Sequence, residues 1–298
     1  MKSDLELPDY REQSPEVAAR FQRLKQRPVA LEVSNLCKNF ETPRGVVTAL
    51  DHVSFAVHKR ELLSVIGPSG CGKSTLVRIL AGLETPTSGE LRVYDEPVSG
   101  PGRDRGMVFQ GYTLFPWRTV KENVMFGPLM SGRSAFSVEG EAREWIQLVG
   151  LSKFENAYPH QLSGGMKQRV AIARALANQP RVLFMDEPFG ALDAQTRSQM
   201  QAYLLEIWKN VDITIVFITH DLDEAVFLSD RILVLDANPG RVRELVEVSV
   251  PRPRNITQSF DTTFMSVRKH IDHLIHPSGS EQREAPVLRL ALADPDVV

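Results

Sequence analysis

Residues 67–75 read Gly-Pro-Ser-Gly-Cys-Gly-Lys-Ser-Thr, which matches the phosphate-binding pattern G-x-x-x-x-G-K-[ST]. The apolar run at residues 62–66 directly precedes this loop and has the length of a strand, and a helical pattern follows it. Glycines let backbone N–H groups turn toward a phosphate, and the start of a helix adds unpaired N–H groups and a positive dipole end. A strand, a loop and a helix in this order therefore predict a nucleotide-binding unit within an α/β fold.

Each residue of this loop is a candidate contact of a nucleoside triphosphate. The Lys73 ammonium suits the β- and γ-phosphates, the Ser74 hydroxyl suits a Mg²⁺ ion, and Thr75 lies where it would meet the α-phosphate. Cys71 is interpreted as a loop residue and not as a nucleophile. A glycine-rich turn without a ligand is the alternative, but the lysine and the hydroxyl together argue against it. The candidate contacts are Gly67, Pro68, Ser69, Gly70, Cys71, Gly72, Lys73, Ser74 and Thr75.

A second strand-like run, residues 182–185, delivers two adjacent carboxylates, Asp186 and Glu187, to its carboxyl end. Successive residues of a strand point to opposite sides, so we expect the two acids to have different tasks. Asp186 suits the coordination shell of Mg²⁺, and Glu187 suits the polarisation of an attacking water. The pair therefore favours hydrolysis over a switch that only binds nucleotide. A solvated acid at the strand end is the alternative for Glu187.

Residues 162–169, Leu-Ser-Gly-Gly-Met-Lys-Gln-Arg, indicate a second anion site. Ser163 is placed to cap the Ala-rich helix that follows, and the glycines leave the N–H groups of its first turn open. Taken alone, such a helix start more often serves plain capping. It gains meaning only in combination with the phosphate loop.

The composition is that of an ordinary globular protein, and its balanced charge gives no electrostatic reason to expect a nucleic-acid partner. The 298 residues hold 35 Lys and Arg against 37 Asp and Glu, a formal charge of -2. Two cysteines, Cys37 and Cys71, are too few for a disulfide framework, so a reducing compartment fits. No apolar run approaches the roughly 18 residues of a membrane span, and charges interrupt every apolar stretch of residues 1–28, unlike a signal peptide. We therefore expect a cytoplasmic protein.

Strand-like and helical runs alternate along much of the chain, which is typical of a parallel sheet covered by helices. Between Gln110 and Ser163 the strand signals vanish and helical spacing takes over, which predicts a helical insertion. A short amphipathic helix is expected after Ser14, which would be its N-cap. After Asp236 the chain is expected to be irregular, with a turn at residues 238–240, and no fold signal follows His276.

In this combination and order the motifs resemble those of the ATP-binding subunit of ABC transporters, over about residues 29–254. The resemblance implies an ABC-type P-loop NTPase, an α/β fold with a mainly parallel core sheet, an N-terminal antiparallel β subdomain and a helical subdomain at about residues 111–165. Residues 1–28 would then form an N-terminal extension and residues 255–298 a partly irregular C-terminal extension. The activity implied is ATP hydrolysis coupled to transport across a membrane.

The resemblance also implies roles for residues that the sequence alone leaves undecided. Gln110 resembles the Q-loop glutamine, which would sense Mg²⁺ and the attacking water, and His220 resembles the switch histidine, which would hold the γ-phosphate and order Glu187. Asp193 is similar to the D-loop aspartate, and Phe40 stands where the family places an aromatic ring on adenine. The signature motif would consist of Leu162, Ser163, Gly164, Gly165 and Met166.

Two subunits of that family face each other head to tail, so each ATP lies between one P-loop and the partner's signature motif. Ser163 and Gly165 would then touch the γ-phosphate across the dimer, which explains the second anion site. The implied cofactors are ATP and Mg²⁺. The implied partners are a second ATPase subunit in a homodimer, integral-membrane permease subunits and, indirectly, an extracytoplasmic solute-binding protein. The expected place is the cytoplasmic face of the cell membrane, and no nucleic-acid partner is expected.

Three details are similar to the branch that imports nitrate, sulfonates and taurine: Met166 in place of a common Gln, residues 114–120 and residues 234–241. We therefore expect the ATP-hydrolysing subunit of such an importer. An importer of another small solute, such as bicarbonate or a pyrimidine precursor, and a soluble ABC ATPase without a transport role are the alternatives. Phe115, Pro116 and Trp117 are candidates for the permease contact, and burial in the core is their alternative.

Overall fold

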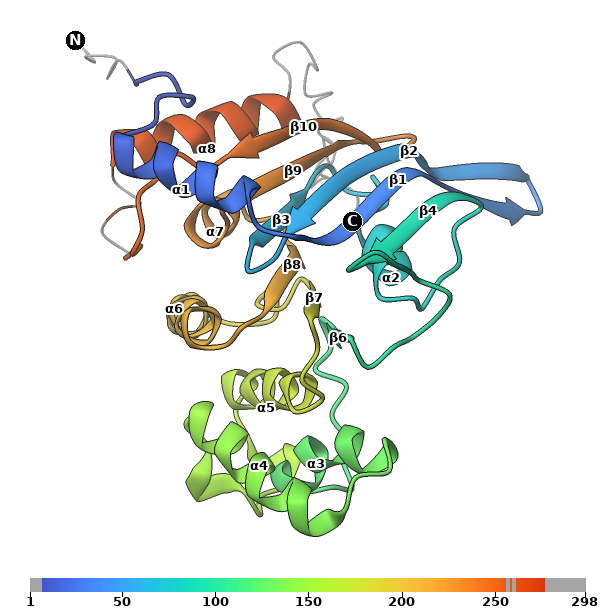
Figure 1. The fold of residues 1–298 in the computed structure, drawn as a ribbon, viewed down its shortest axis with the longest axis vertical. Helices are drawn as coiled ribbons and strands as arrows, with labels where there is room; N and C mark the ends of the chain where they lie inside the picture. The colour runs from blue at the N-terminus through green and yellow to red at the C-terminus, as the bar shows by residue number, and fades with distance from the viewer. Residues whose placement is uncertain (1–6, 256–257, 259–260, 277–298) are drawn as a thin grey trace, which may run out of the picture.

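Two β-sheets and the helices around them make up the fold in the computed structural model (Figure 1). The model describes residues 7–255, 258 and 261–276. The larger sheet has the strand order β10-β9-β3-β8-β7-β6, in which every pair is parallel except β10 with β9. The smaller sheet is antiparallel, in the order β2-β1-β4-β5. The expected α/β fold, with a mainly parallel core sheet and an antiparallel N-terminal part, is confirmed.

The elements have the following bounds. The larger sheet consists of β3 (Leu62–Ile66), β6 (Arg105–Val108), β7 (Val182–Asp186), β8 (Thr214–Ile218), β9 (Arg231–Asp236) and β10 (Arg241–Glu247). The smaller sheet consists of β1 (Val29–Thr42), β2 (Gly45–His58), β4 (Ser88–Val93) and β5 (Glu96–Pro97). The α-helices are α1 (Pro15–Lys25), α2 (Lys73–Leu80), α3 (Val120–Met130), α4 (Ala135–Leu148), α5 (Gly164–Leu176), α6 (Ala194–Asn210), α7 (Leu222–Leu228) and α8 (Thr262–Ile275).

The central strands are buried on both faces, which explains their continuous apolar sequences. In β3, Leu62 and Ile66 belong to the core formed with α5, α6, α7 and α8, whereas Leu63 and Val65 belong to the core formed with α2 and the smaller sheet. The larger sheet therefore separates two hydrophobic cores. Its carboxyl strand ends remain free to carry polar side chains, which is the usual place of a ligand site in such sheets.

The segment between Gln110 and Ser163 contains α3, α4 and two short 3-10 turns, Ser152–Phe154 and Pro159–Gln161, so the predicted helical insertion is confirmed. Figure 1 shows α3 and α4 on the far side of α5 from the sheets. Val124, Ile146 and Val170 belong to a third core, shared by α3, α4 and α5. This core joins the insertion to the larger sheet through α5.

The helix expected after Ser14 is confirmed as α1. The Ser14 hydroxyl accepts the Val17 N–H at 3.4 Å, and Pro15 occupies the first turn, where its missing N–H costs nothing. Val17, Phe21 and Leu24 are buried and form a small cluster of their own.

The expectation of an irregular chain after Asp236 is wrong, apart from the turn at residues 238–240. β10 pairs with β9 as an edge strand, and its alternation of charged and apolar residues is what a half-exposed strand requires. α8 follows, capped by Asp261, with Phe264, Val267 and Ile271 buried at helical spacing.

The segment before α1 and the last helix, α8, meet beside β10. The Tyr10 ring stacks on His270 at a centroid distance of 3.5 Å, and its hydroxyl donates to Glu244 at 3.0 Å. The second Glu244 oxygen lies 3.1 Å from His270 Nε2, and the Ser266 hydroxyl donates to the Pro8 carbonyl at 2.6 Å. The N-terminal segment and α8 are therefore parts of one packed unit.

Candidate functional site

The phosphate loop lies between β3 and α2, as the sequence predicts. Gly72 has φ 89°, and a side chain there would bring its Cβ within 2.8 Å of the Ala49 carbonyl, so only glycine fits at this helix start. Lys73 Nζ donates to the carbonyls of Gly67 at 2.8 Å and Pro68 at 3.0 Å. The ammonium thus lies inside the loop, where it can exchange these carbonyls for phosphate oxygens.

Asp186 and Ser74 come from neighbouring elements and meet beside the loop. Ser74 Oγ donates to Asp186 Oδ1 at 3.4 Å. Burial and the neighbouring Glu187 carboxylate raise the pKa of Asp186. A divalent cation beside Asp186 would offset both effects, and a hydroxyl and a carboxylate are oxygen ligands that suit Mg²⁺. This donor set therefore fits the ion that the sequence implies.

Three polar side chains meet at the carboxyl ends of three adjacent strands, β6, β7 and β8. Glu187 Oε2 lies 3.3 Å from Gln110 Nε2 and 3.3 Å from His220 Nδ1. Because parallel strands end at one edge of the sheet, residues that directly follow each strand converge although they lie far apart in sequence. The structure thus brings Gln110, Glu187 and His220 together.

The different directions of Asp186 and Glu187 do not arise from strand alternation, so that part of the prediction is corrected. β7 ends at Asp186, and Glu187 has φ 44°, in the left-handed region. The turn directs Glu187 toward Gln110 and His220, while Asp186 stays beside Ser74. A non-glycine residue with this backbone conformation costs free energy and is frequent at functional sites.

The Leu-Ser-Gly-Gly-Met motif opens α5. Ser163 is the N-cap, and its hydroxyl accepts the Met166 N–H at 3.3 Å, so the capping prediction is confirmed. The same helix start packs on the start of α6, because a Cβ on Gly165 would lie 2.6 Å from Thr196 Cγ2. Asp193 caps α6 by accepting the Thr196 N–H at 2.9 Å. Ser163 and Asp193 therefore cap two helices whose first turns pack against each other.

Comparison with known proteins agrees with this geometry. A family model described as ABC transporter matches residues 50–190. An uncharacterized ABC transporter ATP-binding protein of Methanocaldococcus jannaschii is 52% identical over 247 residues, which cover 83% of this chain and 91% of that protein. The chain belongs to the ABC transporter ATP-binding proteins.

Two relatives with more specific names are similar over nearly their whole length. A nitrate import ATP-binding protein of Synechocystis is 46% identical, covering 86% of this chain and 98% of its own length. An aliphatic sulfonates import ATP-binding protein of Bacillus thuringiensis is 43% identical, covering 82% and 97%. Among solved structures, a dimeric ATP-binding cassette in a post-hydrolysis state, bound to ADP and Pi, has a TM-score of 0.65 at 33% identity, covering 73% of this chain and 98% of that one. This ABC protein is therefore an ATPase with a nucleotide-binding cassette.

The sequence did not reveal an arginine that connects two motif loops of this ABC ATPase. Arg197, on α6, donates to the Leu192 carbonyl at 3.1 Å and lies 3.6 Å from Asp221 Oδ2. Leu192 precedes the D-loop aspartate, and Asp221 follows His220 and caps α7. Arg197 thus joins the D-loop to the histidine loop. From the sequence alone, an arginine near the start of a helix would be interpreted as solvent-exposed. No sequence signal distinguishes Arg197 from such a surface arginine.

Phe40 of the ABC ATPase lies near the outer end of β1 and is 37% exposed. The Lys38 ammonium lies 4.8 Å from the centroid of its ring. An accessible aromatic face is what adenine stacking would need.

Of the residues proposed to contact a permease, one is exposed on the surface and another is packed against a neighbouring side chain. Trp117 is 71% exposed, whereas Phe115 packs on Phe126 at a centroid distance of 4.5 Å. The fully buried Asn123 amide holds this loop: it accepts the Phe115 N–H at 2.9 Å and donates to the carbonyls of Phe115, Arg118 and Thr119. Trp117 is thus presented to solvent by a rigid loop.

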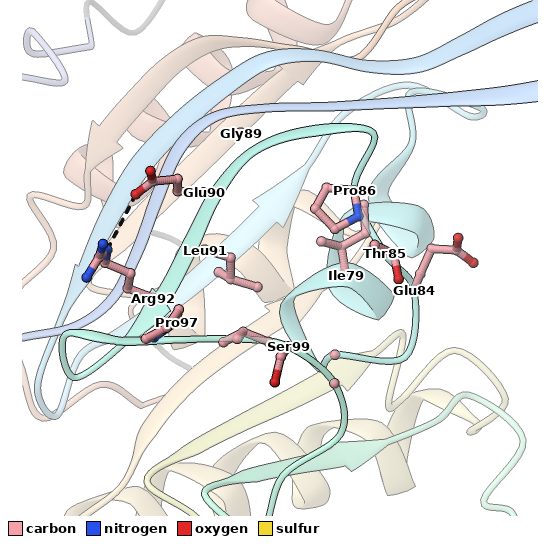
Figure 2. A pocket seen from close by; sticks show the side chains of 13 residues that line it. Ile79, Glu84, Thr85, Pro86, Gly89, Glu90, Leu91, Arg92, Pro97 and Ser99 are labelled. Carbon is pink, nitrogen blue, oxygen red and sulfur yellow. Dashed lines mark ion pairs between the residues drawn. The ribbon is translucent and has the colours of Figure 1, made fainter.

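A hollow of about 380 Å³ lies at the far end of α2 from the phosphate loop (Figure 2). Ile79, Pro86 and Leu91 provide apolar walls, and an ion pair between Glu90 and Arg92 borders it. None of the motif residues of the ABC ATPase lines this hollow. It is separate from the nucleotide site.

Proposed function

We propose that this ABC ATPase energises the import of a small anionic solute of the nitrate, sulfonate or taurine class through a separate permease. The observation that carries the proposal is the similarity, over nearly their whole length, to import proteins named for nitrate and for aliphatic sulfonates. Met166 and the loop at residues 114–120 support the same branch. Within the described ranges, no helix combines the length and apolar character needed to cross a membrane.

We propose that Glu187 accepts a proton from the attacking water, while His220 and Gln110 fix its carboxylate. A cavity of about 20 Å³ borders Glu187, Gly190, Thr219 and His220, and about 10–15 Å³ suffices for one water. His220 Nδ1 and Gln110 Nε2 approach the same Glu187 oxygen, which leaves the other oxygen available. A water held there needs positioning more than covalent chemistry.

ATP would be bound by residues 67–75, with Phe40 against the adenine. Lys73 would meet the β- and γ-phosphates, and Thr75 the α-phosphate. Ser74, Asp186 and Gln110 would hold Mg²⁺, which when bound neutralises charge on the phosphates. The free N–H groups of the α5 start, with the Ser163 hydroxyl, would contact the γ-phosphate of the partner subunit's ATP.

We propose that a second ATPase subunit, in a homodimer, completes the site. The phosphate loop and the Ser163 cap lie on different elements, and the α5 start contacts α6. The structure similar to this chain is described as dimeric. Permease subunits would meet the loop carrying Trp117 on the cytoplasmic face of the membrane, and an extracytoplasmic solute-binding protein would act indirectly.

We propose that the ABC domain spans residues 29–254, with the helical subdomain at about residues 111–165 and extensions on either side. The shared core of α3, α4 and α5 supports a subdomain that moves with α5. Tyr10, in the N-terminal extension, contacts Glu244 and also His270 of the C-terminal extension. These contacts support the proposal that the two extensions pack together on the domain.

The test is uptake of labelled taurine, an alkanesulfonate and nitrate by the source cell carrying Glu187→Gln. Because a positioned general base contributes about 10²–10⁴-fold, uptake of the true solute should fall below detection. Glu90→Gln, a neutral change of an exposed carboxylate at the hollow of Figure 2, is the matched control and should leave uptake unchanged.

The pattern of loss decides between the alternatives. Loss of one uptake names the solute. If all three uptakes persist while purified Glu187→Gln protein binds ATP without hydrolysing it, the nitrate, sulfonate and taurine assignment is wrong, and the solute belongs to another class such as bicarbonate or a pyrimidine precursor. If the wild-type protein hydrolyses no ATP, the motor role itself fails.

A further inference from the structure

Three side chains with metal-binding groups meet on the smaller sheet, outside the residues that form the phosphate loop. Cys37 comes from β1, and Asp51 and His52 come from β2. One ligand atom of each lies within 4.8 Å of the others. In the part of the chain that the structure describes, no other group of three or more such residues meets this criterion.

Irregular pairing of the two strands creates this meeting. The register between β1 and β2 shifts across Cys37, between Leu36 and Lys38, and again between Lys38 and Asn39. On the facing strand, His52 has φ 50°, a left-handed conformation that a non-glycine residue adopts at a cost. Residues that alternate strictly across a sheet would point to opposite faces, so the bulge is what turns Cys37 toward the Asp51–His52 pair.

The sulfur is held by a backbone donor. The His52 N–H donates to Cys37 Sγ at 3.3 Å. A cysteine binds metal ions through this sulfur. Cys37 is half-buried, in contrast to the fully buried Cys71 of the phosphate loop. Cys37 is therefore within reach of an ion from solution.

The carboxylate is oriented by a neighbouring arginine. Arg241 Nε donates to Asp51 Oδ2 at 2.8 Å, while Oδ1 lies 2.5 Å from His52 Nδ1. Ligating carboxylates and imidazoles are commonly held by outer hydrogen bonds of this kind. One Asp51 oxygen thus remains directed at the cluster.

We propose that Cys37, Asp51 and His52 bind a transition-metal ion, Zn²⁺ in the first place, with a fourth position open to water. A thiolate, an imidazole and a carboxylate suit Zn²⁺, whereas Mg²⁺ prefers oxygen ligands alone. The hydrogen bond of 2.5 Å between Asp51 Oδ1 and His52 Nδ1 would have to open, because two ligands at about 2.0–2.2 Å from a tetrahedral Zn²⁺ lie farther apart than that. The His52 side chain, 73% exposed, is free to make that adjustment.

The position of the site indicates which part of the structure a bound ion would stabilise. Asp51 N–H donates to the Gly240 carbonyl at 2.9 Å, and the Gly240 Cα lies so close to the phosphate loop that a Cβ there would reach the Cys71 carbonyl. An ion held by β1 and β2 would therefore stiffen the strands that support this loop from behind. This site does not depend on the proposed solute.

The test is metal titration of the full-length, untagged chain without nucleotide, with Co²⁺ as a spectroscopic probe and Zn²⁺ as a competitor. One equivalent of Co²⁺ should produce a thiolate-to-cobalt absorption band, and Zn²⁺ should abolish it. Cys37→Ser should remove the band, and His52→Ala should weaken Co²⁺ binding by at least about tenfold. The matched control is His160→Ala, an exposed histidine elsewhere, which should bind Co²⁺ like the wild type.

Two results would overturn the proposal. The first is the absence of a thiolate band in the wild type at one equivalent of Co²⁺. The second is a band of equal strength in Cys37→Ser, which would assign the binding to other groups. His52→Ala changes an exposed side chain, so its Co²⁺ affinity remains interpretable even if Cys37→Ser fails to fold.

Discussion

The contact between the signature helix and α6 predicts that Gly165→Ala impairs the ATPase through packing. The added Cβ would lie 2.6 Å from Thr196 Cγ2, well inside van der Waals contact. Thr196 cannot relieve the overlap by rotation without losing its hydroxyl hydrogen bond to Asp193. The start of α5 must therefore shift away from α6.

The magnitude follows from two opposing effects. Overpacking by one methyl group costs about 1–3 kcal/mol, and alanine in place of glycine returns at most about 1 kcal/mol of helix propensity. A net cost of about 1 kcal/mol lowers the population of the correctly placed α5 start about fivefold. ATP hydrolysis should fall by about this factor, while ATP binding to the phosphate loop of one subunit should stay unchanged.

Thr196→Ser provides the decisive comparison, because it keeps the hydroxyl and removes only the methyl group that clashes. The assay is steady-state ATPase activity of the wild type, Gly165→Ala, Thr196→Ser and the double variant at saturating ATP, with nucleotide binding measured in parallel. The double variant should recover most of the lost activity. If it is as slow as Gly165→Ala alone, the packing explanation is wrong, and the glycine is needed for close approach of the backbone to phosphate.

Three further changes test the interior. Arg231→Leu should lower the free energy of unfolding by about 3–5 kcal/mol in a denaturant titration, because it leaves the fully buried Glu61 without its bidentate partner. Leu at both positions should restore much of the lost free energy of unfolding. An unchanged free energy of unfolding in Arg231→Leu would contradict the argument. Burial raises the pKa of Glu224, so the stability it contributes when protonated is lost as pH rises through that raised value. Glu224→Gln should therefore raise the Tm above roughly pH 7 and change it little near about pH 4, and a pH-independent shift would refute this. Asn123→Ala should cost about 1–3 kcal/mol and speed limited proteolysis near Trp117, since four hydrogen bonds are lost; unchanged cleavage would show that the amide does not hold the loop.

The parts of the site that the sequence predicts are those in which chemistry and strand position coincide. Asp186 and Glu187 follow an apolar strand, and a lysine and a hydroxyl end a glycine loop, so each motif indicates its own location. The meeting of Glu187 with Gln110 and His220 follows once their strands are known to be neighbours and parallel. The backbone turn at Glu187 does not follow, because a single left-handed residue leaves no periodic trace.

The missed elements had weaker or misleading local signals. The apolar spacing of Phe264, Val267 and Ile271 in α8 is present in the sequence, but it was not recognised, and residues 255–298 were expected to be partly irregular. Arg197 and Asn123 could not be recognised, because each acts on backbone carbonyls or loops that the sequence does not place beside it. Tyr10 and Glu244 are separated by 234 positions, so their contact depends on the completed sheet.

The contact between the segment before α1 and α8 has a consequence for synthesis on the ribosome. Pro8 meets a residue 258 positions later, so at about 5–20 residues per second roughly 13 to 50 seconds pass before its partner has been added. Arg20 of α1 likewise lacks, until late in synthesis, the carbonyls of residues 248 and 250 to which it donates. α1 therefore cannot take its final position before most of the chain has been made.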